Sequence, residues 1–434
     1  MTTHRLALLL AVATLAAATP LAAAEDKKSW TGESVMHTKR PEKIRFGDQV
    51  DGKQVWFVLR DYLPIKVRED RDGWLRIHDG HIEGWADKDD FILVNDAPAY
   101  FHHRVQADPK DAWALSMRGV GWYEKGEYDN AIKDFDECIR LDPTNANDFN
   151  WRGNAHSNKK DYDRAIQDYD EAIRLNPKYA LASFNRGNAH MYKMDYDRAI
   201  ADYDAATRLD PRYASAFAGR GNLYSEKRDY DRAIKDYDEA VRLDPKDAYA
   251  FNGRAQAYLA KKDYDRAIAN YDVAIRLNPK SADAFRDRSI AQMVTRRPGG
   301  VKGFQAVIDL QGWKGDRTVY AVILGHLAAG QAGDDAAAKC FLTDSAGKLD
   351  AAWPEPAVRF LRGDLDEPGL LNLATDDGKR TEARCFLGLH HANRGRPAEA
   401  LAHYRWVRQH GTPSFTEYGI AVAELDRLDA AAKP

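Results

Sequence analysis

One phrase recurs along the middle of the chain at a fixed interval of 34 residues. KDYDRAIQDYDEAIRLNPK occupies residues 160–178, returns with few changes at 194–212, 228–246 and 262–280, and has a looser copy at 126–144. The prolines that close the copies keep the interval: Pro143, Pro177, Pro211, Pro245 and Pro279. Such a period predicts a repeat architecture, because a unit of this size cannot bury its apolar face alone and must stack on its neighbours.

The repeated phrase has the pattern of an amphipathic helix. In the copy at 160–178 the apolar side chains follow helical spacing: Tyr162, Ala165, Ile166, Tyr169, Ala172 and Ile173. Asp161 is placed to cap the start of this helix, and Pro177 ends it because the residue before a proline avoids helical geometry. We therefore interpret the phrase as scaffold, with its charges on a solvated face.

The residues that repeat match the pattern of tetratricopeptide (TPR) repeats. The first helix of each pair carries a glycine: Gly119, Gly153, Gly187 and Gly221. The second carries an alanine and, four residues later, an aromatic residue, as in Ala165 and Tyr169. Over residues 111–280 the chain resembles this family. The resemblance implies a mainly α fold, a right-handed solenoid of helix–turn–helix pairs whose first helices line a concave surface.

Helical geometry selects the first-helix side chains that would face a partner. At 100° per residue, the residue after the packing glycine lies beside those four after, three before and seven before it. This stripe is almost free of charge in a chain that is 30% charged, and it is rich in amides and aromatic rings. The candidate partner-binding residues are Trp113, Met117, Asn147, Trp151, Asn154, Asn158, Asn185, Asn188, Tyr192, Asn222, Tyr249 and Gln256.

Two features of the first helices leave alternatives open. The amides that follow the glycines offer donors and acceptors for a peptide backbone or a sugar hydroxyl, or they are inherited repeat sequence without a ligand. A second ladder, of arginines, lies one residue before the glycine position, and each arginine either pairs with helix acids such as Asp168 or binds an anion. The arginines are Arg118, Arg152, Arg186, Arg220, Arg254 and Arg288.

The N-terminal segment predicts export. Residues 1–24 combine a short positive start, an apolar run and small residues before Glu25, which is typical of a secretory signal peptide cleaved near Ala24. We expect the mature protein in the periplasm or cell envelope. We expect no transmembrane segment in it, because no other stretch is long and apolar enough to cross a bilayer.

The segment after the signal peptide reads as strands separated by turns. The runs at 54–60, 63–69, 73–79 and 83–94 are short and rich in β-branched or aromatic residues, and Asp79-Gly80 is a hairpin signal. GWLRI and EGWADKDDFIL resemble bacterial SH3-like (SH3b) domains over residues 32–95. The resemblance implies a small β-barrel that binds cell-wall peptides or protein tails. Candidate groove residues are Tyr62, Trp56, Trp74 and Trp85, although some of these tryptophans are expected to be core.

The part of the chain after the repeats is helical and more divergent. TRRPGG, after residue 294, interrupts the pattern, and glycine, alanine and aromatic residues at TPR spacing return at 320–341 and 382–407. We interpret residues 301–430 as a divergent TPR-like domain that caps a solenoid spanning 98–294.

Composition and motifs exclude several classes of function. The formal net charge of −3 gives no reason to expect a nucleic-acid partner, because phosphate binding needs a concentrated basic face. Cys138 is expected to be a buried thiol rather than a catalytic one. The histidines, including the pairs His102-His103 and His390-His391, have no metal-binding spacing. We therefore predict no cofactor, no metal and no catalytic site.

These observations together predict an exported adaptor. A protein or peptide partner would lie in the TPR groove, and the SH3-like domain would bind the cell wall or a second protein. One rival is an envelope enzyme, most plausibly a peptidoglycan hydrolase with its site hidden in residues 301–434. Another is a glycan-binding module that uses the amides and aromatic rings.

Overall fold

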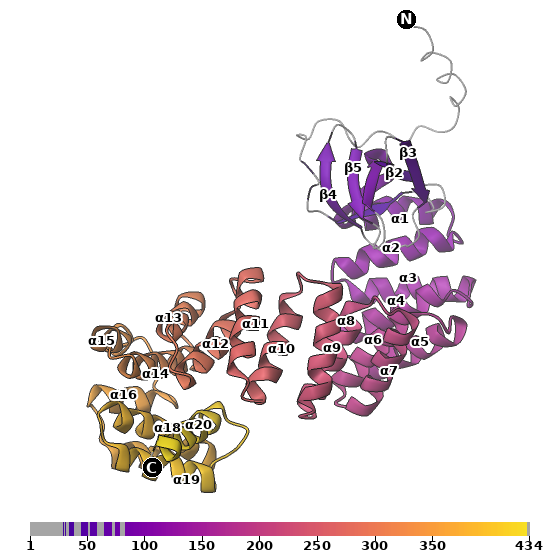
Figure 1. The fold of residues 1–434 in the computed structure, drawn as a ribbon. Helices are drawn as coiled ribbons and strands as arrows, with labels where there is room; N and C mark the ends of the chain where they lie inside the picture. Colours follow the sequence, from indigo (N-terminus) through magenta and orange to yellow (C-terminus); the bar gives the residue numbers. More distant parts are fainter. Residues whose placement is uncertain are drawn as a thin grey trace, which may run out of the picture. The chain divides into compact units, whose positions relative to one another are not determined.

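The computed structural model describes most of the chain. It covers Ser29, Thr31 and residues 34–38, 45–50, 53–58, 65–71, 74–78 and 83–431, with only the backbone of 45–50, 53–58, His78 and Glu83. The predicted signal peptide lies outside the described residues. The chain divides into an N-terminal unit, residues 1–177, and a C-terminal unit, residues 178–434. Figure 1 shows strands followed by helices along the chain.

The N-terminal unit begins with antiparallel strands. Their order in the sheet is β3-β2-β6-β5-β4-β1-β7, and His78 of β5 pairs with Glu83 of β6, as the predicted hairpin requires. The sequence did not reveal β1 and β2, and the run at 83–94 is two strands separated by a short 3-10 turn. The strands are β1 (Ser34–His37), β2 (Arg45–Val50), β3 (Lys53–Val58), β4 (Ile65–Arg71), β5 (Trp74–His78), β6 (Glu83–Asp87) and β7 (Phe91–Leu93).

Helices complete the N-terminal unit. Met36 of β1 lies in one core with Phe101 of the first helix and Met117 of the second, so the strands pack directly on the start of the helical stack. The helices are α1 (Ala97–Ala107), α2 (Ala112–Glu124), α3 (Tyr128–Leu141), α4 (Ala146–Asn158) and α5 (Tyr162–Leu175).

The described part of the C-terminal unit is entirely helical. The first helices continue the 34-residue repeat: α6 (Ala180–Tyr192), α7 (Tyr196–Leu209), α8 (Ala214–Glu226), α9 (Tyr230–Leu243), α10 (Ala248–Ala260), α11 (Tyr264–Leu277) and α12 (Ala282–Val294). The remaining helices vary in length: α13 (Gly300–Gln311), α14 (Asp316–Gln331), α15 (Asp335–Asp344), α16 (Glu355–Arg362), α17 (Glu367–Leu373), α18 (Asp377–Asn393), α19 (Pro397–His410) and α20 (Thr416–Ala431).

In the first four repeats an aromatic ring lies on a glycine, whereas the fifth has Ala255 at the glycine position. A Cβ atom added to Gly153 would be 2.7 Å from the Tyr169 ring, and one added to Gly187 would be 2.9 Å from Tyr203. Those distances leave no room for a side chain, because cores are packed at crystal-like density. The same contact joins Gly388 of α18 to Tyr404 of α19. The glycine and the aromatic residue that identify the repeat in the sequence are therefore a packed pair.

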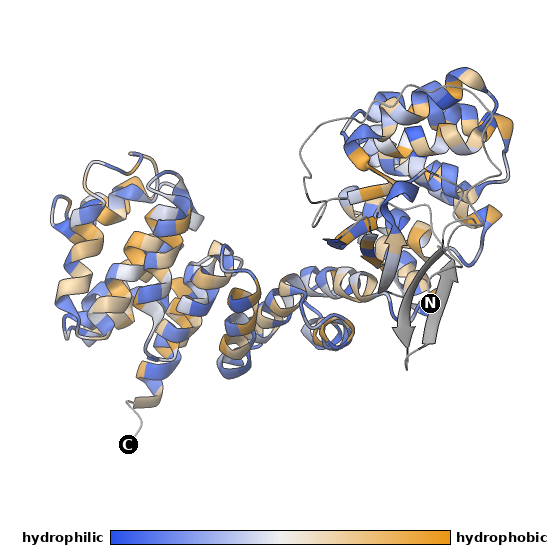
Figure 2. Ribbon diagram, turned by 90° about the horizontal axis from the view of Figure 1, so that it is seen from above, coloured by the Kyte–Doolittle hydropathy of each residue, from blue (hydrophilic) through white to orange (hydrophobic). Residues whose placement is uncertain are grey.

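The helix ends form as the sequence predicts. The Asp161 side chain accepts a hydrogen bond from the Arg164 backbone N–H at 3.3 Å, and α5 ends at Leu175 before Asn176-Pro177. The turn between the helices of each pair places one residue in the left-handed conformation, such as Lys160 at φ 64° and Gly395 at φ 69°. Figure 2 shows polar and apolar residues interleaved along the helices of both units, as expected when each helix buries one face.

The predicted fold class is confirmed: the chain is mainly helical, with a TPR-type helical stack preceded by a small antiparallel sheet. The domain boundaries stay predictions. In the part of the chain that the structure describes, no helix has both the length and the apolar character needed to cross a membrane.

Candidate partner-binding site

A cavity of about 240 Å³ opens between α2 and α4 of the N-terminal unit. It lies at the N-terminal ends of two first helices and beside the turn that precedes α4. Three of the predicted groove residues, Trp113, Asn147 and Trp151, line it together. We call it the two-tryptophan cavity, and its lining residues are Ala112, Trp113, Ser116, Asp142, Asn145, Asn147, Asp148 and Trp151.

The two tryptophans of the cavity are held in place by rings on their other sides. Trp113 packs edge-on against Phe101, with ring centroids 5.4 Å apart, and the Arg104 guanidinium lies 4.6 Å from the centre of its indole. Trp151 packs edge-on against Tyr123 at 5.2 Å. Both indoles are buried and positioned by their neighbours, so they form rigid walls rather than mobile surface groups.

A buried carboxylate belongs to the same cavity. Asp148 is 1% exposed, and it accepts hydrogen bonds from the Ser116 hydroxyl at 2.8 Å and from the Asn145 side-chain amide at 2.7 Å. Burial raises the pKa of Asp148 to about 6, against the lowering effect of these two hydrogen bonds. A carboxyl group held in this way costs stability at neutral pH, which is a common property of binding and catalytic groups.

Asp148 departs from the repeat at a position that is otherwise uniform. Residues at the same place in the other first helices are alanines with no exposed surface: Ala114, Ala182, Ala216, Ala250 and Ala284. An alanine therefore satisfies the packing of this position. A carboxylate is therefore not needed to fill this position, although its hydrogen bond with Ser116 also joins α4 to α2.

The other groove residues of the N-terminal unit lie elsewhere. Met117 has no exposed surface, because α1 and the strands cover it, so its prediction as a groove residue is corrected. The amide oxygen of Asn154 accepts a hydrogen bond from the Tyr169 hydroxyl at 2.8 Å. Asn158 is exposed, and its amide donates to the Tyr123 hydroxyl at 2.8 Å.

The predicted amide ladder has a structural role in three repeats. Asn188 and Asn222 of the C-terminal unit accept hydrogen bonds from the hydroxyls of Tyr203 and Tyr237, at 2.6 and 2.5 Å, as Asn154 does from Tyr169. A buried tyrosine hydroxyl needs such a partner. Gln256, at the equivalent position of the next repeat, instead donates to Asp287 at 3.3 Å. In these three repeats the ladder therefore serves the core with its oxygens.

Two tyrosines on the first helices of the C-terminal unit are exposed instead of buried. Tyr192 is 59% exposed and Tyr249 is 60% exposed, whereas the packing tyrosines of the second helices, Tyr203, Tyr237 and Tyr271, are almost fully buried. The Asn222 amide donates to the Tyr249 hydroxyl at 2.5 Å, which links the exposed ring to the ladder. Asn185 and Asn188 are partly buried nearby on α6. We call Asn188, Tyr192, Asn222 and Tyr249 the amide–tyrosine stripe.

The arginines before the glycines pair with aspartates. Arg152 bonds to Asp168 of its own repeat at 2.6 Å and to Asp136 of the preceding repeat at 2.7 Å. Arg220 likewise contacts Asp236 and Asp204. The arginines therefore connect successive repeats, and their charge is neutralised by carboxylates. This favours the ion-pair interpretation over an anion-binding stripe.

The candidate groove residues of the strand region are only partly described. Trp74, at the start of β5, is 42% exposed, and Trp85 of β6 is half-buried. Trp56 lies in β3, but its side chain is outside the described part, as is the whole of Tyr62. The two described tryptophans are thus available at the surface to different degrees.

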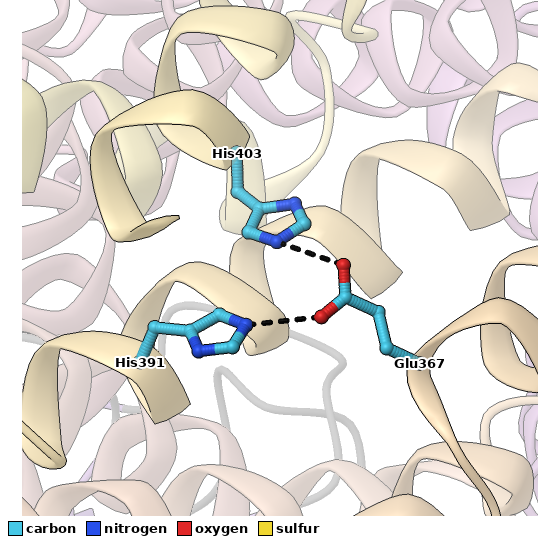
Figure 3. Close-up of side chains that lie close together, drawn as sticks. All are labelled: Glu367, His391 and His403. Atoms are coloured by element: carbon cyan, nitrogen blue, oxygen red, sulfur yellow. Dashed lines mark hydrogen bonds and ion pairs between the residues drawn. The ribbon is translucent and has the colours of Figure 1, made fainter. Parts of the chain in front are cut away.

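One cluster of potential metal ligands was not found from the sequence. The Nε2 atom of His391 lies 3.0 Å from one carboxylate oxygen of Glu367, and the Nε2 atom of His403 lies 3.3 Å from the other (Figure 3). The three residues come from α18, α17 and α19. Their separations in sequence match no metal motif. The sequence does hold one signal: His403 stands at the position that is Asp168 in the second repeat, while His391 keeps the position of His156.

The cysteines agree with the sequence-based expectation for Cys138. It is buried, and burial raises the pKa of its thiol, so it is not a reactive thiolate. Cys138, Cys340 and Cys385 are all free.

Comparison with known proteins gives family matches for the central part of the chain. A family model described as Tetratricopeptide repeat matches residues 152–214, 187–224 and 218–282, and one described as TPR repeat matches residues 122–160. No enzyme family is indicated. A search of curated protein sequences gave no match.

Several solved structures match part of this chain. MamA is 24% identical, with a TM-score of 0.35, over 38% of this chain and 96% of that one. YrrB, described as a TPR protein with an unusual peptide-binding site, is 21% identical, with a TM-score of 0.37, over 41% and 92%. Pseudomonas aeruginosa pilF is 17% identical, with a TM-score of 0.40, over 46% and 89%. From the family matches, residues 122–282 of this chain are tetratricopeptide repeats.

Proposed function

We propose that the chain is an exported, non-catalytic adaptor that holds a peptide segment of a partner protein against the first helices of its TPR repeats. The observation that carries this proposal is the two-tryptophan cavity with Asp148 buried at its side. Asp148 replaces an alanine and accepts a raised pKa, so the chain keeps a carboxylate there at a cost in stability.

The chemistry of the cavity fits a peptide side chain that is apolar along its length and carries a donor at its end. The indoles of Trp113 and Trp151 supply flat apolar walls, and buried aromatic pockets of this kind commonly dominate binding energy. The Asp148 carboxylate supplies an acceptor. Asn147, half-buried at the same cavity, offers an amide to the peptide backbone.

The amide–tyrosine stripe would give the partner a further contact on the C-terminal unit. Tyr192 and Tyr249 present large exposed rings, and such rings supply contact area at low entropic cost. The asparagines beside them use their oxygens for the core tyrosines, so the stripe would recognise a partner mainly through the rings.

The strand region would supply a second contact, to the cell wall or to another protein. The support is the resemblance of residues 32–95 to SH3-like domains, together with the exposed indole of Trp74. Export rests on the signal-peptide pattern of residues 1–24. Fractionation of cells that express the full-length chain tests it: the processed protein is expected in the envelope fraction.

Capture of a partner from a cell-envelope extract tests the proposed groove. The full chain with Asp148→Ala should fold, because alanine is the residue of the other repeats at this position, and it should lose the partner. Asp129→Ala is the matched control, since it removes one exposed carboxylate from α3 of the same unit. Equal capture by wild type and Asp148→Ala would exclude the cavity as the binding site.

A second pair of variants tests the stripe. Tyr192→Ala with Tyr249→Ala should weaken capture. Leu209→Ala with Leu277→Ala should not, since these exposed leucines end the second helices α7 and α11. Release of fragments from purified peptidoglycan by the wild-type chain would instead support the enzyme interpretation.

A further inference from the structure

We propose that Glu367, His391 and His403 form a binding site for a divalent transition-metal ion, with Zn²⁺ as the best-fitting ion. Two imidazole nitrogens and one carboxylate are a recurring donor set for zinc sites that keep a further position for water. The proposal is independent of the partner-binding function.

The spacing of the three donors suits a tetrahedral ion. Metal–ligand distances of 2.0–2.1 Å separate two tetrahedral ligands by roughly 3.3 Å. The observed distances from Glu367 oxygens to Nε2 of His391 and His403 are 3.0 and 3.3 Å, and one donor atom from each residue lies within 4.8 Å of the others. The two nitrogens contact different oxygens of the carboxylate, so the donors would close in by up to about 1.5 Å to hold one tetrahedral ion.

The two imidazoles point toward the Glu367 carboxylate, each at a different oxygen, and the three side chains come from three helices (Figure 3). Both imidazoles are buried, while Glu367 is half-buried, so the carboxylate is the part of the cluster that solvent reaches. The rings of His391 and His403 are nearly parallel, with an interplanar angle of 2° and centroids 5.4 Å apart. Rings fixed in this way lose little freedom on binding an ion.

The cluster arises by substitution at defined repeat positions. In the second repeat, His156 stands three residues after the packing glycine, and Asp168 stands one residue before the packing aromatic residue. The Nε2 atom of His156 lies 3.9 Å from a carboxylate oxygen of Asp168. There Arg152, one residue before the glycine, bonds to the aspartate.

In α18 and α19 the same histidine position is kept as His391, but the aspartate is replaced by His403 and the arginine by Leu387. Glu367 of α17 then approaches the histidines in place of Asp168. The arginine that neutralises the carboxylate in the repeats is therefore missing from its position, and a second imidazole takes the place of the carboxylate. As a result, α18 and α19 hold a set of metal donors where the repeats hold an ion-pair network.

One residue works against the ion. The Nη1 atom of Arg384 lies 3.4 Å from Nδ1 of His403, and because a guanidinium only donates, Nδ1 must accept. The proton of His403 is then on Nε2, facing Glu367. Metal binding through Nε2 requires the other tautomer, so Arg384 has to turn away. Arg384 also adds positive charge beside the ion, and its removal should tighten binding.

Titration of the metal-free full chain with Zn²⁺ and Co²⁺ tests the proposal. We expect one ion per chain, and a visible ligand-field spectrum of Co²⁺ typical of four-coordination. Glu367→Gln, His391→Gln and His403→Gln should each weaken binding by about 100-fold or more, since even outer-shell changes cost about 10–100-fold. His410→Gln, an exposed histidine of the same helix as His403, is the matched control.

Arg384→Gln separates a metal site from a metal-free hydrogen-bonded cluster. A glutamine can accept the Nδ1–H of metal-bound His403, so Zn²⁺ affinity should rise by about 10-fold. Zn²⁺ should raise the melting temperature of the wild type and of this variant, but not of Glu367→Gln. Absence of stoichiometric binding in wild type, or equal affinity in Glu367→Gln, would overturn the proposal, with circular dichroism confirming that each variant is folded.

Discussion

The tandem repeats and the α18–α19 pair share a framework but differ in their polar contacts. In both regions an aromatic ring of the second helix lies on a glycine of the first, as in Gly187 with Tyr203 and Gly388 with Tyr404. In the repeats the Tyr203 hydroxyl donates to Asn188, whereas Leu389 occupies that position in α18 and the Tyr404 hydroxyl has no hydrogen-bond partner among the described residues. The packing was retained while the polar network was exchanged.

This difference indicates where function is to be sought in a repeat protein. Residues that recur at the same repeat position set the spacing of the helices. A residue that differs from the others at its repeat position must be explained by its own surroundings. Asp148 among alanines leads to the two-tryptophan cavity, and His403 in an aspartate column leads to the cluster with Glu367. The repeated phrase itself leads to neither.

The largest expected effect tests the shared framework. Gly187→Val and Gly388→Val each place a side chain within the space of an aromatic ring, and each should destabilise its region by about 3 kcal/mol or more. Thermal unfolding measures this, with Gly419→Ala as the control because nothing lies within 4 Å of a Cβ there. If only Gly187→Val destabilises, the α18–α19 pair does not share the framework.

The next effect concerns Asp148, which stands where the other repeats have alanine. The pKa of Asp148 is about 6 in the folded chain and about 3.8 when unfolded, so between these values the folded state holds a proton that the unfolded state has lost. Stability should therefore fall as the pH rises through this interval, by about 3 kcal/mol in total. Asp148→Ala should lack this fall. The free energy of unfolding of both proteins, measured from pH 4 to 7, checks this. The same pH dependence in the two proteins would contradict a raised pKa for Asp148.

A smaller effect separates the two polar networks. Tyr203→Phe removes a hydrogen bond to Asn188 and should cost about 1 kcal/mol. Tyr404→Phe removes a hydroxyl that has no partner in the described part of the chain, so stability should be unchanged or higher. Chemical denaturation of the two variants gives both values, and equal losses would show that the Tyr404 hydroxyl is satisfied.

The smallest effect is expected on the surface of the phrase. Arg174 pairs with Glu171 at 2.6 Å, but Arg174 is exposed and Glu171 only half-buried, and surface pairs of this kind contribute little to stability. Arg174→Gln should leave the melting temperature unchanged within error. A clear fall in melting temperature would mean that this surface ion pair stabilises the stack, as the ion pairs of Arg152 with Asp136 and Asp168 are expected to do.

The sequence predicted those features that depend on local periodicity. The helix limits of the phrase, the Asp161 cap and the glycine–aromatic pairs follow from spacing within a repeat. Met117 was misplaced because the helical pattern treats every repeat alike, whereas α1 and the strands cover the first one. The cluster of Glu367 with two histidines was missed, because three helices bring together residues 12 and 24 positions apart.

A photo-crosslinking residue placed at Asn147 tests the central claim most directly. Asn147 lines the two-tryptophan cavity, and Lys133 is exposed on α3 of the same unit, so it serves as the comparison position. After irradiation in a cell-envelope extract, a covalent adduct with one defined protein is expected from position 147 and not from 133, and Asp148→Ala should abolish it. Adducts of equal yield from both positions, or an adduct at 147 that survives Asp148→Ala, would contradict the account.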